Sequence, residues 1–242
     1  MTRKLILLIG LIIVVAIFLK FGRSIYMPVI NKIKGNQTVE TRIDDIQVDV
    51  WDRLENNLNL AGYKMDYPKE VILAAFKEEQ ILQVYSKDYN GVKLIKEYSF
   101  TAFSGELGPK LKEGDKQIPE GIYEVEYLNP NSSFYLSIKV SYPNEFDKSK
   151  TELPNFADMG GDIFIHGKSA TIGCIPIGDQ AIEEVFVLTQ KAINNKVKVI
   201  ISPRDFRTNP EYPNITSIEW EKELYELIEK EIKTLPNNGY NP

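Results

Sequence analysis

The chain of 242 residues contains one cysteine and one histidine, Cys174 and His166, and only eight positions separate them. A thiol with an ordinary pKa is only a few per cent ionised at neutral pH, roughly, and a histidine within hydrogen-bond reach can remove its proton or pair with the thiolate. The loop between the two residues is long enough to fold back on itself. The spacing therefore indicates a cysteine nucleophile that is activated by a histidine base.

A glycine follows the histidine and another precedes the cysteine, as Gly167 and Gly173. Gly173 leaves the approach to Cys174 unobstructed and permits a bend of the backbone. The backbone N–H groups of Gly173 and Cys174 are candidates for an oxyanion hole, which stabilises the charge that develops on an attacked carbonyl. The second ring nitrogen of His166 needs an orienting partner. We expect the carbonyl of Gly167 in this role, because no acidic residue falls at a suitable spacing.

Each reactive residue also has a structural explanation, since a lone cysteine is usually a small buried hydrophobe and a lone histidine is usually structural. Their joint occurrence in one glycine-flanked loop favours catalysis. One cysteine cannot form an internal disulfide or a cysteine-based metal site, and a catalytic zinc ion needs about three protein ligands. The sequence therefore predicts no metal and no other cofactor, although carboxylate sites stay open. The net charge of −5 gives no indication of nucleic-acid binding.

The motif resembles the L,D-transpeptidase catalytic domain of the YkuD type. That family carries a His-Gly pair, a short spacer and a Ser/Thr-x-Gly-Cys box, which His166, Gly167 and residues 171–174 match. Five upstream stretches are similar to the YafK-like murein L,D-transpeptidase branch, namely residues 103–110, 113–115, 119–121, 129–133 and 141–144. Ile172 is a departure, because many members of the wider family have a second histidine directly before the Gly-Cys pair.

The resemblance implies that Cys174 attacks the carbonyl of a diaminopimelate residue in a peptidoglycan stem peptide, at a bond between an L and a D centre. A thioester forms, His166 protonates the leaving amine, and an amine acceptor then gives a new cross-link or protein attachment. Two alternatives stay open. The thioester is hydrolysed in an amidase or carboxypeptidase that trims stems or detaches linked groups, or the domain binds the wall without catalysis.

The resemblance also implies a set of residues around the substrate groove. These are Ser104, Gly105, Tyr142, Asn144 and Thr171. Each of them has an alternative explanation as a residue that forms a turn or supports the fold.

Short strands must position the reactive pair. Apolar and alternating runs predict strands at residues 71–76, 81–85, 92–100, 122–128, 134–140, 163–165 and 196–202. Because Gly, Pro and Asn separate these runs, the pattern predicts an α+β fold that is mainly β. The resemblance makes it an L,D-transpeptidase-type β-sandwich with a catalytic loop and flanking helices. We expect one of these helices to follow the cysteine loop, with Asp179 as its N-cap.

The N-terminus carries an uncharged apolar run at residues 5–19 between basic residues. It predicts a transmembrane helix, and a cleaved signal segment is the alternative. We therefore divide the chain into an anchor or signal (1–24), a linker with an amphipathic helix over residues 44–60 (25–65), the catalytic domain (66–205) and a helical tail (206–242). The implied substrate predicts a bacterial envelope protein, anchored in the cytoplasmic membrane with its catalytic domain in the periplasm, or secreted after signal cleavage.

Overall fold

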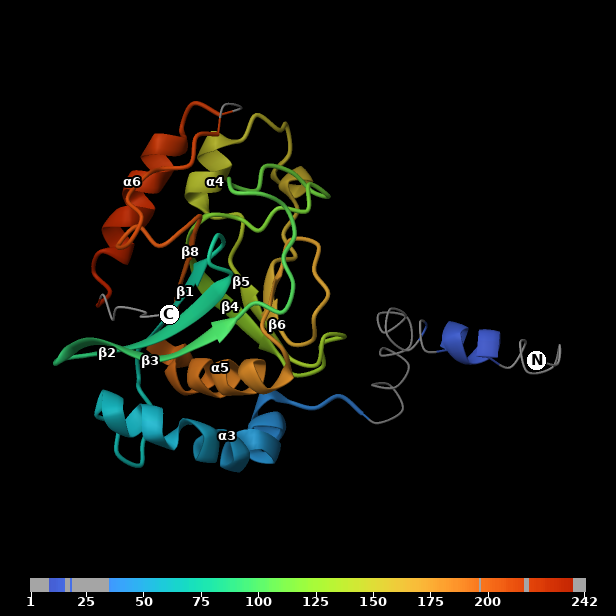
Figure 1. Cartoon of the computed structure of the whole chain (residues 1–242), viewed down its shortest axis with the longest axis vertical. Coiled ribbons are helices and arrows are strands. Elements are labelled where there is room, and N and C mark those ends of the chain that lie inside the picture. Colours follow the sequence, from blue (N-terminus) through green and yellow to red (C-terminus); the bar gives the residue numbers. More distant parts are fainter. Residues whose placement is uncertain (1–8, 16–17, 19–34, 196, 216–217, 237–242) are drawn as a thin grey trace.

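The computed structural model describes residues 9–15, 18, 35–195, 197–215 and 218–236. Eight strands are hydrogen-bonded in the order β3-β2-β1-β8-β4-β5-β6-β7 (Figure 1). Their bounds are β1 Val71–Phe76, β2 Ile81–Asp88, β3 Gly91–Ser99, β4 Gly121–Asn129, β5 Ser137–Val140, β6 Phe164–His166, β7 Ile175–Pro176 and β8 Lys198–Ser202. The neighbours pair antiparallel except for β1 with β8 and β6 with β7, which are parallel.

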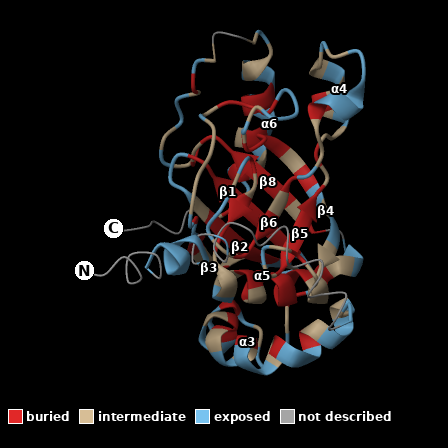
Figure 2. Ribbon diagram, turned by 90° about the vertical axis from the view of Figure 1, so that its right-hand side faces the viewer, coloured by how far each residue is buried: buried red, intermediate tan, exposed pale blue. Residues whose placement is uncertain are grey.

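Four helices accompany the sheet: α3 (Val39–Ala61), α4 (Glu145–Lys150), α5 (Asp179–Ala192) and α6 (Glu221–Ile232). Two short 3-10 helices span Phe156–Met159 and Ile193–Asn195. α5 and α3 lie on one side of the strands, with α3 on the outside, and α6 lies on the other side (Figure 1). The strands and the inner helix faces are buried, whereas the outer face of α3 is largely exposed (Figure 2).

Strand β4 joins the two halves of the sheet. Its first four residues pair with β8, and the rest pairs with β5 after a register shift between Val125 and Tyr127. An irregularity of this kind bends a strand and increases its twist. The eight strands therefore form one curled sheet, and the sandwich stays a prediction. The mixed α+β architecture around a sheet is confirmed.

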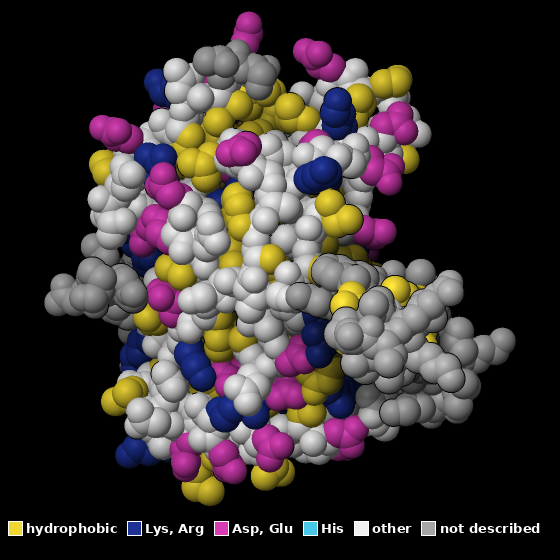
Figure 3. All heavy atoms as spheres, turned by 45° about the vertical axis from the view of Figure 1, so that its right-hand side comes forward, with side chains coloured by type: hydrophobic (Ala, Val, Ile, Leu, Met, Phe, Trp, Pro, Cys, Tyr) yellow, Lys and Arg dark blue, Asp and Glu magenta, His cyan; other side chains and the backbone are white. Residues whose placement is uncertain are grey.

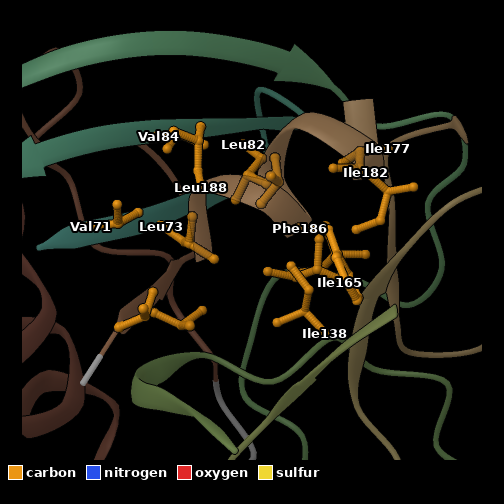
Figure 4. Close-up of a cluster of buried hydrophobic side chains, with 14 of the residues drawn as sticks. Val71, Leu73, Leu82, Val84, Ile138, Ile165, Ile177, Ile182, Phe186 and Leu188 are labelled. Atoms are coloured by element: carbon orange, nitrogen blue, oxygen red, sulfur yellow. The ribbon is translucent and has the colours of Figure 1, made fainter. Parts of the chain in front are cut away.

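In the half of the sheet that carries the reactive loop, one face packs against α5. Ile138, Ile165 and Ile175 are fully buried there, and the first two point towards Phe186 of α5 (Figure 4). Because side chains alternate along a strand, the residues next to these isoleucines point to the opposite face. That opposite face holds the candidate site.

Helix α3 begins earlier than the sequence pattern predicts, since Thr38 accepts the N–H of Thr41 as N-cap. The helix ends at Ala61, with Gly62 as its C-cap in the left-handed conformation. The helix packs on the domain through a row of buried apolar residues, namely Ile43, Ile46, Val50, Leu54 and Leu58. Arg53 adds ion pairs to Glu183 and Glu184 of α5.

The predicted N-cap of α5 is wrong by one position. Gly178 is the N-cap and Asp179 is the first helical residue. The Asp179 carboxylate accepts the backbone N–H of Lys168 at 3.0 Å and forms an ion pair with its ammonium group, so it serves the reactive loop.

The predicted N-terminal transmembrane helix is not supported. Of residues 5–19, the structure describes only 9–15 and 18, and these are helical. Among the described residues, the helices are too short or too polar to cross a bilayer. On the molecular face shown in Figure 3, basic and acidic side chains are interspersed.

Candidate active site

The loop from His166 to Cys174 connects two neighbouring parallel strands. Ile165 of β6 lies beside Ile175 of β7, and His166 lies beside Pro176. Continued back by one residue, this register puts Cys174 beside Phe164. Because side chains alternate, Cys174 and His166 share the face opposite Ile165, as diagonal neighbours. The register thus puts the one thiol and the one imidazole of the chain on the same face of the sheet.

The imidazole of His166 is held by its own neighbour. Nδ1 lies 2.5 Å from the carbonyl oxygen of Gly167. A carbonyl oxygen only accepts, so Nδ1 carries the proton and Nε2 is left with its lone pair. The ring is 1% exposed and stacks against Phe134, with the ring centres 4.5 Å apart. Burial lowers the pKa of His166, and the Gly167 carbonyl opposes this effect. The imidazole is therefore a neutral acceptor at neutral pH.

Cys174 is partly exposed and is not bonded to His166 within the described part of the chain. Its Sγ donates to the carbonyl oxygen of Asp162 at 3.4 Å. Burial raises the pKa of the Cys174 thiol, while the backbone of Phe164 and the positive charges of Lys139 and Lys110 lower it. These shifts favour a neutral thiol and a neutral imidazole at neutral pH, the protonation states that general-base activation requires.

The amides that flank the sulfur already have partners. The N–H of Cys174 donates to Oγ1 of Thr171 at 2.8 Å, and this hydroxyl donates to the Cys174 carbonyl at 2.7 Å. The N–H of Gly173 donates to Oγ of Ser104 at 2.8 Å. An oxyanion can use these amides only when a hydroxyl gives way or shares the N–H. Thr171 thus bonds the backbone of Cys174, and Ser104 bonds the backbone of the preceding residue, Gly173.

Two glycines allow close packing of the segment around Lys116 and Gln117, Gly173 on the cysteine loop and Gly105 within the segment between β3 and β4. Gly173 has a φ of +109°, and a Cβ at this position would lie 2.9 Å from the carbonyl oxygen of Gln117. Gly105 has a φ of +79°, and its Cβ would lie 2.9 Å from the carbonyl oxygen of Lys116. The sequence identifies Gly105 and Gly173 but not Gln117, because the contact of Gln117 with Gly173 runs through its backbone carbonyl.

Gly167 is required for a different reason. A Cβ there would lie 2.7 Å from both Oδ1 of Asp179 and the carbonyl oxygen of Phe134. The next residue, Lys168, has a positive φ of 63°. Its carbonyl accepts the hydroxyl of Thr101 at 2.6 Å. The backbone of Lys168 is therefore held at its N–H by Asp179 and at its C=O by Thr101.

The other two predicted groove residues are engaged in the fold. Tyr142 is buried and donates its hydroxyl to the carbonyl of Lys110 at 3.1 Å, and burial raises its pKa. Asn144 is the N-cap of α4, where its Oδ1 accepts the N–H of Asp147 at 2.9 Å. Its Nδ2 donates to the carbonyl of Ile122 at 2.9 Å. Both ends of the Asn144 amide thus support the fold, which is the alternative explanation that the sequence offers for this residue.

Residues 70–201, more than half of the chain, match the family model of the L,D-transpeptidase catalytic domain (YkuD). The chain belongs to this family. The match lies within the predicted catalytic domain, residues 66–205.

Curated relatives include the protein named "Putative L,D-transpeptidase YafK" of Escherichia coli, in two strains. The identity is 34% over 125 residues, which is 51% of this chain and 48% of the relative. The chain thus spans about half the length of the curated relatives that it matches.

Two solved structures also match. The helical cell shape determining protein Pgp2 of Campylobacter jejuni is 21% identical, with 70% of this chain and 71% of that chain covered and a TM-score of 0.45. The protein Bd1075 of Bdellovibrio bacteriovorus is 18% identical, with 69% of this chain and 56% of that chain covered and a TM-score of 0.42.

Proposed function

We propose that the chain is a cysteine-dependent acyl transferase of peptidoglycan stem peptides, an L,D-transpeptidase with Cys174 as nucleophile and His166 as base. Membership of the family supports the reaction class. The observation that carries the residue roles is the pairing of β6 with β7, through which the thiol and the imidazole share one face of the sheet. The bond from Nδ1 of His166 to Gly167 leaves Nε2 to accept the thiol proton.

The reaction proceeds in two halves. Nε2 of His166 takes the proton of Cys174 as Sγ attacks the carbonyl carbon of a diaminopimelate residue. The tetrahedral intermediate collapses to a thioester, and the imidazolium gives its proton to the leaving amine. An acceptor amine then attacks the thioester, loses its proton to His166, and the thiolate recovers that proton on leaving. Water in place of the amine gives hydrolysis, so exclusion of water decides the outcome.

We further propose that the apolar residues 5–19 hold the protein in the cytoplasmic membrane, with the catalytic domain on the side of the wall. The test is cell fractionation of the full chain and of a variant in which residues 5–19 carry three lysines. Recovery of the full chain from alkali-washed membranes, and loss of the lysine variant from them, supports the anchor. Recovery of both in the soluble fraction contradicts it.

The experiment that tests the reaction is mass analysis of muropeptides after incubation with the purified full chain. New dimers or exchanged amines show transfer, and shortened or released products without new bonds show hydrolysis. Cys174→Ala is the control, because the change from thiol to methyl is small and the fold should persist. Turnover that persists in Cys174→Ala contradicts the mechanism. A wall pull-down without products of either kind in the native protein supports a binding module instead.

A further inference from the structure

A row of four side chains crosses the sheet and ends at the nucleophile. Tyr127 of β4 lies opposite Lys139 of β5, and Lys139 lies opposite Phe164 of β6. The parallel register of β6 and β7 then puts Cys174 beside Phe164. All four side chains point to the face opposite the buried isoleucines. Lys139 is therefore the cation that this face presents in line with the reactive sulfur.

Lys139 has a largely buried side chain, and its ammonium group has one long ion pair. Its side chain is 9% exposed, and the nearest acid is Oδ1 of Asp162 at 4.0 Å, on a side chain that is 96% exposed. The ammonium also lies 5.3 Å from the ring centre of Phe164. Within the described residues, no hydrogen bond from this ammonium is formed. The long pair with a highly exposed carboxylate leaves this ammonium available to a closer anion.

The two other buried lysines of the domain are arranged differently. Lys77 lies 2.8 Å from Glu120 and donates to two backbone carbonyls. Lys110 lies 2.6 Å from Asp115 and donates to the carbonyl of Lys112. Both ammonium groups thus have a close carboxylate, whereas the acid nearest to Lys139 lies 4.0 Å away.

The ammonium and the thiol contact the same residue. Sγ of Cys174 donates to the backbone oxygen of Asp162 at 3.4 Å, and Nζ of Lys139 lies 4.0 Å from its carboxylate. A carbonyl carbon that Cys174 attacks must approach Sγ closely. In the residue after the scissile bond, the carboxyl carbon is three covalent bonds further on, at roughly 4 Å. An anion at that position falls within the surroundings of Lys139.

We propose that Lys139 binds the free carboxylate of the residue that leaves the acyl donor. Lys139 then acts as a specificity residue, which selects stem peptides that end one residue after the scissile bond. This inference rests on the proposed function, because it assumes that Cys174 attacks a stem peptide. Tyr127, which packs edge-on against Phe164 with ring centres 6.3 Å apart, forms an apolar wall beside the carboxylate.

The test compares two synthetic donors, a stem tetrapeptide with diaminopimelate third and D-alanine last, and the same peptide ending in D-alaninamide. Release of D-alanine or its amide gives kcat and KM. We expect Lys139→Met to raise KM for the acid donor about 10- to 100-fold and to leave KM for the amide unchanged. Lys139→Arg should retain the preference for the acid. Lys87→Met is the matched control, since Lys87 is an exposed strand lysine that pairs with Glu70 at 3.7 Å.

Equal losses on both donors in Lys139→Met, together with a shifted pH profile of Cys174 alkylation, overturn the inference, because Lys139 then acts on the thiol. Binding of both donors to Cys174→Ala, with and without Lys139→Met, separates this inference from the proposed reaction. Cys174→Ala should bind the acid donor more tightly than the amide donor, and Lys139→Met should remove that difference. If both results hold but the native protein releases no product, carboxylate recognition stands and the proposed reaction fails. Equal binding of both donors overturns the inference.

Discussion

The side-chain hydroxyl of Thr171 bonds both backbone groups of Cys174: it accepts the N–H at 2.8 Å and donates to the carbonyl at 2.7 Å. The two bonds close a tight turn of four residues, in which Gly173 has a positive φ. They fix the backbone from which the thiol projects. We therefore expect the threonine of the Ser/Thr-x-Gly-Cys box to position the proposed nucleophile.

Two replacements of Thr171 should distinguish the effect of its hydroxyl from the effect of its side-chain shape. Thr171→Val keeps the branched side chain but leaves the N–H and carbonyl of Cys174 without this partner, which costs about 1–3 kcal/mol. We expect a loss of about tenfold or more in kcat/KM, read from release of the leaving amine, and near-native activity in Thr171→Ser. Equal activities of the valine and serine variants would show that the hydroxyl does not position Cys174.

Two glycines with the same backbone conformation allow strain and crowding to be separated. Gly173 and Gly91 have φ values of +109° and +108°, but a Cβ at Gly173 would lie 2.9 Å from the Gln117 carbonyl, whereas a Cβ at Gly91 would meet nothing within 4 Å. Gly91→Ala should lower the unfolding free energy by about 1–2 kcal/mol, from backbone strain alone, and preserve turnover. Gly173→Ala should cost more and abolish turnover. Urea unfolding and product release measure both effects, and indistinguishable variants would contradict the close packing.

The pKa shifts of the reactive pair predict a wide plateau of activity. General-base catalysis needs a neutral His166 and a protonated Cys174. Burial lowers the pKa of His166 from its ordinary 6.5, and burial raises the pKa of Cys174 from its ordinary 9.0. The acid limb of kcat/KM should therefore lie below pH 6.5, and the alkaline limb above pH 9.0. An acid limb centred above pH 6.5 would instead indicate a resting pair of thiolate and imidazolium.

Alkylation of Cys174 by iodoacetamide gives a second measurement of the same pair. The thiolate is the reacting species, so a raised pKa predicts slow alkylation at pH 7 that increases towards pH 9. His166→Ala removes the proton acceptor and should slow the reaction near neutral pH. Equal rates in the native protein and in His166→Ala would remove His166 as the activating group.

The strands β1 and β7 show which parts of the fold the sequence predicts. Residues 71–76 form an apolar run of six and were predicted as a strand with the bounds that β1 has in the structure. β7 has two residues, too few for any periodicity, and the sequence gives no indication of it. Yet the register of β7 with β6 is what aligns Cys174 with Phe164. The pattern thus predicts the framework, while the pairing that assembles the site depends on tertiary contacts.

The site residues divide in the same way. His166 and Cys174 are visible because each is the only residue of its kind. Lys139 is one of many lysines, and only the cross-strand pairing with Phe164 distinguishes it. The carbonyl of Asp162, which accepts the thiol, is a backbone group and has no sequence signal at all. Side-chain chemistry was therefore predictable where it is rare, and backbone chemistry was not.

The loop that packs on Gly173 is held in turn by a buried ion pair. Lys77 and Glu120 are both fully buried and lie 2.8 Å apart. Lys77 also donates to the carbonyls of Gly108 and Ile118, and Glu120 accepts the hydroxyl of Tyr225 on α6. Burial lowers the pKa of Lys77, and the charge of Glu120 opposes this effect. Strand β1, the loop and α6 thus meet in one closed network.

Removal of one charged member of this network should lower the unfolding free energy more than removal of the charge from both members. Lys77→Met leaves a carboxylate buried without its cation and should lower the unfolding free energy by about 3–5 kcal/mol. The double variant Lys77→Met with Glu120→Gln buries no charge, and its amide can still bond Tyr225, so it should recover part of that loss. Urea unfolding of the native protein, both single variants and the double variant completes the cycle. If the losses in unfolding free energy of the two single variants add up in the double variant, the two side chains do not stabilise each other. The loop would then be positioned by the packing of Gln117 and its neighbours alone.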